Sequence, residues 1–267
     1  AAVQRIAKEQ PAGIAMRLML LGKLLEVKDY AQAEALVGKW LAEYAAKERP
    51  DRAEWAVFRL RALKVYEKAS RFDKAQELLD AWIAAGTDED FLTVLRREKL
   101  RMYGLAKQFD EAVSYAKKWF RNEPKSIEPR SALFTVLLEG EAYAKLHAVL
   151  DEWILAEKDP ESLEMLHIKK LIAFNKAKNI DGLVRFGRKW IAKNPTAETP
   201  NMAMIGELID LKKHDEALKV AEDWLARVEK MPASAPADKG RAKLVESAKR
   251  AVVNVLLMAE KKGEFRP

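Results

Sequence analysis

Cysteine is absent from this 267-residue chain, which excludes disulfides and cysteine-based metal sites. Glycine and proline are scarce, at 11 and 10 residues, and alternating Val/Ile/Thr runs typical of strands are missing. No apolar run approaches the roughly 20 residues of a membrane span, and no signal peptide begins the chain. With 49% hydrophobic and 33% charged residues, the composition predicts a soluble, folded, all-α protein without membrane insertion of this segment.

The charge balance is mildly basic. The formal net charge is +7 and the sequence pI is about 9.3. The 48 basic residues are interspersed with 41 acidic ones, so the excess permits binding to nucleic acid or acidic surfaces without requiring it. Lack of cysteine suits cytoplasm and bacterial periplasm equally, and the compartment stays open between them.

One helical segment of about twelve residues recurs six times, as in FDKAQELLDAWI and HDEALKVAEDWL. Each copy ends beside a tryptophan, and these are Trp40, Trp82, Trp119, Trp153, Trp190 and Trp224. The spacings are 42, 37, 34, 37 and 34 residues, and an apolar helix precedes each copy. A period near 34 residues with two helices per unit is typical of a helical solenoid.

The repeat resembles the tetratricopeptide repeat superfamily over nearly the whole chain. The residues that carry the resemblance are Tyr30/Ala33, Phe72/Ala75, Phe109/Ala112, the variant His214/Ala217, Tyr66, Tyr103, Pro124 and Pro195. The resemblance implies a right-handed α-α superhelical solenoid of antiparallel helix pairs, with about six full repeats and a partial repeat at each end. The family has a small residue where the six Trp lie and a large one three places earlier, so large and small have exchanged places here.

We predict a single solenoid domain over residues 1–267. Residues 1–11 look like the remnant of a preceding repeat, and residues 12–230 hold the six helix pairs. Residues 231–238 form a Pro/Ala/Ser linker. Residues 239–267 form a capping helix or the start of a further repeat. Because both ends fall within repeats, we expect the segment to be part of a longer protein.

Three helix starts carry recognisable signals. Thr87 with Asp90 resembles a capping box. Asp159-Pro160 and Thr199-Pro200 each have the form of an N-cap followed by proline in the first helical turn.

From Trp82 on, a second period of 71 residues separates alternate repeat Trp. Basic residues precede one set of Trp and acidic residues precede the other, for example Asp80 and Asp151/Glu152. The pattern fits ion pairs between neighbouring outer helices of a duplicated two-repeat ancestor. The alternative is a convex charged stripe that docks a partner.

No catalytic constellation is recognisable, and we predict a non-enzymatic protein without cofactors. His147, His167 and His214 lie in different repeats. Glu164 and His167 share a helix face, but no second pair of this kind supports a two-helix metal site. Gly-rich phosphate loops and Ser or Cys nucleophile motifs are also missing.

In tetratricopeptide proteins the first helices of successive repeats line a concave groove, and the resemblance carries this over to the present chain. The predicted partner-binding residues are Arg61, Lys64, Arg97, Arg101, Ser131, Thr135, Ile168, Ile172 and Met202, with Leu60 among the groove positions. Clustered guanidinium groups suit carboxylates, and the apolar end of the groove extends the preference to an acidic, amphipathic segment. The alternative is that the arginines pair with Glu98 or a neighbour.

The leading hypothesis is a protein–protein interaction scaffold that binds a peptide or partner protein in the groove. The first alternative is a helical repeat protein that binds single-stranded RNA or another nucleic acid, which the pI favours and the interleaved acids oppose. The second alternative is a regulatory or organising segment of a larger envelope or secretion assembly. The sequence leaves the oligomeric state open.

Overall fold

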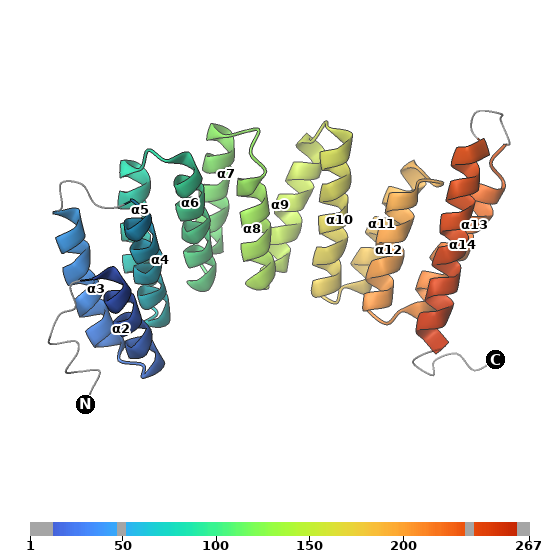
Figure 1. The fold of residues 1–267 in the computed structure, drawn as a ribbon. Coiled ribbons are helices and arrows are strands. Elements are labelled where there is room, and N and C mark those ends of the chain that lie inside the picture. The colour runs from blue at the N-terminus through green and yellow to red at the C-terminus, as the bar shows by residue number, and fades with distance from the viewer. Residues whose placement is uncertain (1–12, 47–51, 233–237, 261–267) are drawn as a thin grey trace. The chain divides into compact units, whose positions relative to one another are not determined.

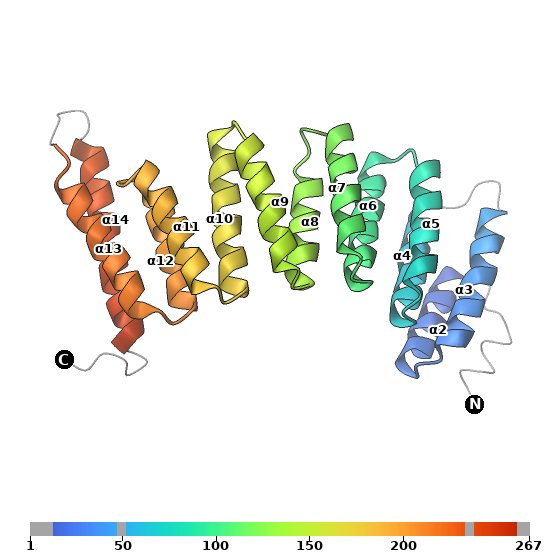
Figure 2. The same cartoon turned by 180° about the vertical axis from the view of Figure 1, so that it is seen from behind.

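The computed structural model describes residues 13–46, 52–232 and 238–260, and every regular element within these ranges is an α-helix. Figures 1 and 2 show the helices from opposite sides. The helices are α2 (Ile14–Glu26), α3 (Tyr30–Ala45), α4 (Arg52–Lys68), α5 (Phe72–Ala85), α6 (Glu89–Leu105), α7 (Phe109–Asn122), α8 (Glu128–Glu139), α9 (Tyr143–Ala156), α10 (Pro160–Lys176), α11 (Ile180–Lys193), α12 (Glu198–Asp210), α13 (His214–Glu229) and α14 (Asp238–Glu260). The predicted all-α helical repeat is confirmed. Even-numbered helices up to α12 are first helices of their repeats, and odd-numbered helices are second helices.

The helices form two compact units, Ala1–Gly140 and Glu141–Pro267. In unit 1, α2 packs on α3 and α4, α5 packs on α4 and α6, and α8 packs on α6 and α7. Its core combines leucines of the first helices with tryptophans of the second, such as Leu63 and Leu100 with Trp40 and Trp82. The apolar stripe of each helix therefore lies against its sequence neighbours.

In unit 2, α9 packs on α10, and α10 also contacts α11 and α12. Helix α14 packs on α13 and α12 and buries Ala248, Ala251 and Val255. That arrangement suits the predicted capping role. The predicted remnant at residues 1–11, part of the linker (233–237) and residues 261–267 lie outside the described residues, and the single-domain assignment stays a prediction.

Each turn between a first and a second helix contains one residue with positive φ that is not glycine. These residues are Lys28, Ser70, Lys107, Glu141, Lys178 and Lys212, with φ between 53° and 60°. All six lie twelve positions before the Trp of their repeat. The amide of the following residue often closes the turn, as Gln108 N–H does on the carbonyl of Tyr103 at 2.9 Å. A left-handed backbone at a residue with a Cβ costs energy, so the tertiary arrangement imposes this turn.

The exchange of large and small residues is visible in the packing. All six repeat tryptophans are buried, and the residues three places earlier include Ala116, Gly187 and Ala221. A Cβ on Gly187 would lie 2.6 Å from Sδ of Met204. Met204 of α12, the first helix of the next repeat, therefore fills the space that a side chain at position 187 of α11 would need.

Two of the three predicted helix starts need correction. The N-cap of α6 is Asp88, whose carboxylate accepts the Phe91 N–H at 3.1 Å, and Thr87 lies outside the helix. Helix α12 begins at Glu198, so Thr199 lies inside its first turn. The prediction for Asp159 is confirmed, because its carboxylate accepts the Ser162 N–H at 2.8 Å.

Candidate functional site

All nine predicted groove residues lie on first helices and none is fully buried. Unit 1 contributes Arg61, Lys64, Arg97, Arg101, Ser131 and Thr135, and unit 2 contributes Ile168, Ile172 and Met202. Arg61, Arg97, Thr135 and Met202 are exposed, whereas the other five are half-buried.

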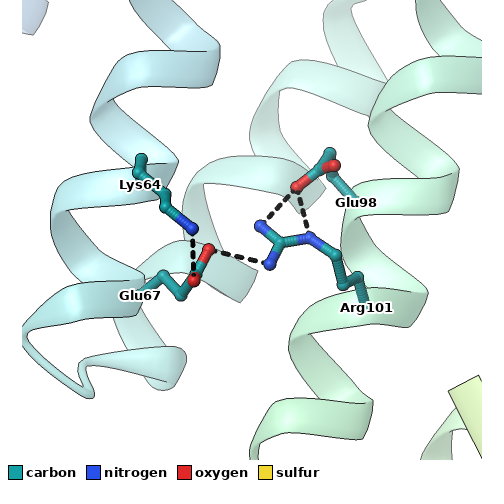
Figure 3. Close-up of polar contacts among 4 residues, drawn as sticks. All are labelled: Lys64, Glu67, Glu98 and Arg101. Carbon is teal, nitrogen blue, oxygen red and sulfur yellow. Dashed lines mark hydrogen bonds and ion pairs between the residues drawn. The ribbon is translucent and has the colours of Figure 1, made fainter. Parts of the chain in front are cut away.

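Lys64 and Arg101 belong to an ion-pair network that joins α4 to α6 (Figure 3). Nζ of Lys64 donates to Oε1 of Glu67 at 2.6 Å. Arg101 donates from Nε and Nη2 to Oε2 of Glu98, at 3.0 and 2.8 Å. Nη1 of Arg101 also lies 2.7 Å from Oε2 of Glu67. Two carboxylates thus stand opposite two of the predicted cations.

The network shifts the pKa of Glu67 and the pKa of Arg101. Burial by itself would raise the pKa of Glu67, but hydrogen bonds from Lys64 and Arg101 outweigh it and hold the pKa below its usual value. Burial would lower the pKa of Arg101, but Glu98 and Glu67 raise it. Each charge stabilises the ionised form of its partners.

Arg97 has a looser partner, since its Nε lies 3.8 Å from Oε2 of Glu128. The pairing alternative is therefore the one observed for Lys64, Arg97 and Arg101. The acidic character of the partner stays a prediction. Carboxylates of the chain itself already pair with three of the cations that such a partner would meet.

Two buried lysines escaped the sequence prediction. Lys99 of α6 pairs with Asp80 of α5, and Lys170 of α10 pairs with Asp151 of α9. Both lysine side chains are only 6% exposed, and they lie 71 residues apart. Two acidic residues of the 71-residue period, Asp80 and Asp151, therefore form ion pairs with the first helix that follows them in the chain. The position of each lysine on an otherwise apolar helix face was the missed signal.

It was also not predicted from the sequence that an arginine lies over each repeat tryptophan of unit 1. The residue 23 positions before each repeat Trp of unit 1 is an arginine. The guanidinium carbon of Arg17 lies 5.0 Å from the ring centre of Trp40. For Arg59 over Trp82 this distance is 5.2 Å, and for Arg96 over Trp119 it is 5.8 Å. The fixed spacing of these arginines from the Trp would have revealed the column in the sequence.

In unit 2 the position 23 residues before Trp190 holds His167, and the position 23 residues before Trp224 holds Asn201. His167 stacks on Trp190 with 4.9 Å between ring centres. Its Nδ1 lies 2.6 Å from the carbonyl oxygen of Leu163. In the next repeat the amide oxygen of Asn201 accepts a hydrogen bond from Nη2 of Arg227 at 3.0 Å.

An open cavity of about 510 Å³ lies beside Arg59. It is lined by residues of α4, by the end of α5 and by the start of α6, including Trp55, Ala85, Gly86, Phe91 and Val94. Its volume is within the range of small-ligand pockets. Within the described part of the chain, no group of three His, Asp or Glu side chains could hold a metal ion. None of the described helices is long and apolar enough to span a membrane.

Helix pairs, the six matching turns and the aromatic/Ala pattern define a divergent tetratricopeptide-like helical repeat protein. No family model and no curated protein matches the sequence.

Solved structures of tetratricopeptide proteins are similar to this chain. A tetratricopeptide repeat protein from Parabacteroides merdae is 12% identical with a TM-score of 0.39, covering 93% of this chain and 92% of its own. The TPR2AB domain of yeast Sti1, in complex with an HSP90 peptide, is 12% identical with a TM-score of 0.34 and coverages of 88% and 98%. The TPR domain of P58(IPK) is 13% identical with a TM-score of 0.25 and coverages of 90% and 79%.

Proposed function

We propose that this protein is a non-enzymatic interaction scaffold whose first helices bind a peptide or partner protein. The observation that carries the proposal is the distribution of exposed apolar side chains. Within the repeats, first helices expose Met16, Met19, Val57, Leu60, Val94, Met165 and Met202. Apolar side chains that stay in water on one class of helix favour a protein partner.

Second helices present a different surface. Among their described large apolar residues, only Leu155 at the end of α9 is exposed, with 91% of its surface accessible. The rest of their outward face is dominated by charged side chains, as at Lys118 and Glu152. This difference between the two helix classes is what a protein that binds its partner through the first helices should have.

Polar groups beside the apolar ones supply directionality. In unit 1, Leu60 and Val94 share the first helices with Arg61 and Arg97, whose side chains are exposed. In unit 2, Met202 belongs to the same repeat position as Ile168, and both belong to the predicted binding residues. A mixed apolar and polar surface suits an amphipathic segment, which is the partner that the sequence predicts.

Site-specific photo-crosslinking tests the proposal. A benzophenone amino acid is placed at Leu60 or Met202 on first helices, and at Leu155 on a second helix as the matched control. We expect protein adducts from the two first-helix positions and none from Leu155, measured by mass spectrometry of extracts of the native host. Equal adducts from all three positions would contradict the assignment of the surface.

A titration with fluorescent single-stranded RNA at low salt separates the nucleic-acid alternative. Because Lys64 and Arg101 are already bonded to carboxylates, we expect no saturable binding. Saturable binding that weakens steeply with salt would favour the alternative.

A further inference from the structure

The cavity beside Arg59 lacks an acidic side chain that two neighbouring repeats possess. In the first repeat, Nη2 of Arg17 lies 2.6 Å from Oε2 of Glu43, three residues after Trp40. In the third, Nη1 of Arg96 lies 2.5 Å from Oε1 of Glu123, four residues after Trp119. Each of these guanidinium groups thus has a ring on one side and a carboxylate from the end of the second helix on another.

Arg59 keeps the ring but not the carboxylate. The residues three and four places after Trp82 are Ala85 and Gly86, and both line the cavity. The guanidinium carbon of Arg59 lies 4.6 Å from the ring centre of Trp55 and 5.9 Å from that of Phe91. Its Nε is buried without a hydrogen-bond partner among the described residues. Within this part of the chain, three aromatic rings therefore surround a cation that forms no ion pair.

An unpaired guanidinium in this environment is costly. Burial lowers the pKa of Arg59, because the charged form is partly removed from water. Hydrogen bonds between guanidinium and carboxylate are among the strongest in proteins and restore what burial removes. An external carboxylate would thus fill the place that Glu43 and Glu123 fill in the neighbouring repeats.

The other residues that line the cavity limit the kinds of ligand that can bind there. Asp88 and Asp90 also line the cavity, although neither forms an ion pair with Arg59. Two exposed carboxylates repel a dianion such as phosphate more strongly than a single carboxylate, and they attract a positive charge on the ligand. Trp55 and Phe91 offer faces for an apolar or aromatic side chain.

We propose that this cavity, the Arg59 cavity, binds a peptide through a Glu or Asp side chain, with an adjacent apolar side chain against Trp55 and Phe91 and a basic residue facing Asp88 and Asp90. The proposal deepens the scaffold function and rests on it, since it names the chemistry of one peptide-binding position in unit 1.

The direct test compares two probe peptides, acetyl-Glu-Phe-Lys-amide and acetyl-Gln-Phe-Lys-amide. Both are titrated into the protein while the Nε–H signal of Arg59 and the indole signals of Trp55 and Trp82 are followed by NMR. We expect the Glu peptide to bind roughly tenfold more tightly than the Gln peptide and to shift these signals. Equal affinities, or no shift at millimolar peptide, would overturn the proposal.

A second test supplies the missing carboxylate from within the chain. Ala85 is exposed, so Ala85→Glu leaves the core unchanged and places an acid three residues after Trp82, as Glu43 follows Trp40. We expect Ala85→Glu to abolish binding of the Glu peptide, with Ala85→Gln as the matched control that retains it. Retained binding in Ala85→Glu counts against the assignment of the cavity.

The same variant gives a readout without ligand. Pairing of the introduced carboxylate with Arg59 should raise the Tm of Ala85→Glu by about 2–4 °C relative to Ala85→Gln. The rise should vanish when both variants carry Arg59→Gln, a comparison that also subtracts any effect of the charge on the end of α5. A rise that survives Arg59→Gln would show that no pair forms and would overturn the proposed geometry. Crosslinks from Met202 report on the scaffold function separately, so failure of one proposal is distinguishable from failure of the other.

Discussion

The two units solve the same packing problem with different chemistry. Where unit 1 places Arg17, Arg59 and Arg96 on its repeat tryptophans, unit 2 places His167 on Trp190 and Asn201 beside the Trp224 repeat. Arginine stays charged throughout the physiological pH range, whereas histidine titrates within it. His167 lies over Trp190 where unit 1 has an arginine over its Trp, so this repeat position differs between the units in its response to pH.

Histidine content sharpens the contrast. All three histidines of the sequence lie in unit 2. The ring of His147 is stacked on Phe174, with 4.0 Å between ring centres, and both of its nitrogens are buried without hydrogen-bond partners in the part of the chain that the structure describes. Burial lowers the pKa of His147 and of His167. The fold of unit 2 therefore favours the neutral form of His147 and of His167.

The largest effect should come from removing the indole that lies beneath Arg59 in unit 1 or beneath His167 in unit 2. Trp82→Ala in unit 1 and Trp190→Ala in unit 2 should each lower the free energy of unfolding by about 3–5 kcal/mol, because both rings are buried. Urea denaturation measures the change, with the exposed Leu155→Ala as control at under about 0.5 kcal/mol. A small loss in either unit would break the equivalence of the two tryptophans.

The buried lysines test where the units should behave alike. Asp80→Asn and Asp151→Asn each leave a nearly buried ammonium without its carboxylate. We expect each to cost about 1–3 kcal/mol of unfolding free energy. Lys99→Met and Lys170→Met, which remove the charge itself, should cost less than the corresponding Asp variants. Unequal losses in the two units would show that the 71-residue period does not carry equal energies.

Acidification should separate the units. A histidine whose folded pKa lies below its unfolded value of about 6.5 contributes stability that is complete above that value and lost as the pH falls through the folded pKa. In unit 1, the pKa of Glu67 is lowered, so its contribution is lost only at lower pH, below the usual carboxyl range. Hydrogen exchange at pH 7 and pH 5 should therefore show weakened protection in unit 2 first.

Glu207 of unit 2 acts in the opposite direction. Burial raises its pKa, so its ionisation destabilises the fold as the pH rises. The histidine contribution is isolated by comparing His147→Phe with the unchanged protein over the same pH range. We expect the variant to lose part of the acid sensitivity, and an unchanged pH profile would refute the role of His147.

The smallest predicted effect concerns the left-handed turns, which the units share. Lys107→Gly and Lys178→Gly should each stabilise the protein by up to about 1 kcal/mol, because glycine adopts positive φ without strain. Lys118→Gly, inside α7, is the control and should cost about 1 kcal/mol. Thermal denaturation measures all three. A loss at Lys107 or Lys178 comparable to that at Lys118 would show that the turns are not strained.

Much of the fold could be predicted from the sequence, because the sequence signals for its helices and turns are local and recur in each repeat. The Trp spacing predicts the helix pairs, and the polar turns around Ser70, Lys107 and Lys178 predict where they reverse. Asp159-Pro160 predicts the start of α10. These features depend on helical periodicity and on capping within a few residues, which neighbours in the chain determine.

The tertiary structure alone decided which charges meet across helices. Glu67 and Glu98 lie three residues from Lys64 and Arg101 on the same helices, but only the approach of α4 to α6 brings Arg101 to Glu67. None of the six residues with positive φ is a glycine, so the sequence did not predict these left-handed turns. That Arg59 has no such carboxylate is recognised only when its surroundings in the structure are compared with those of Arg17 and Arg96. Partners separated by some twenty or more residues are chosen by packing, and no local pattern encodes that choice.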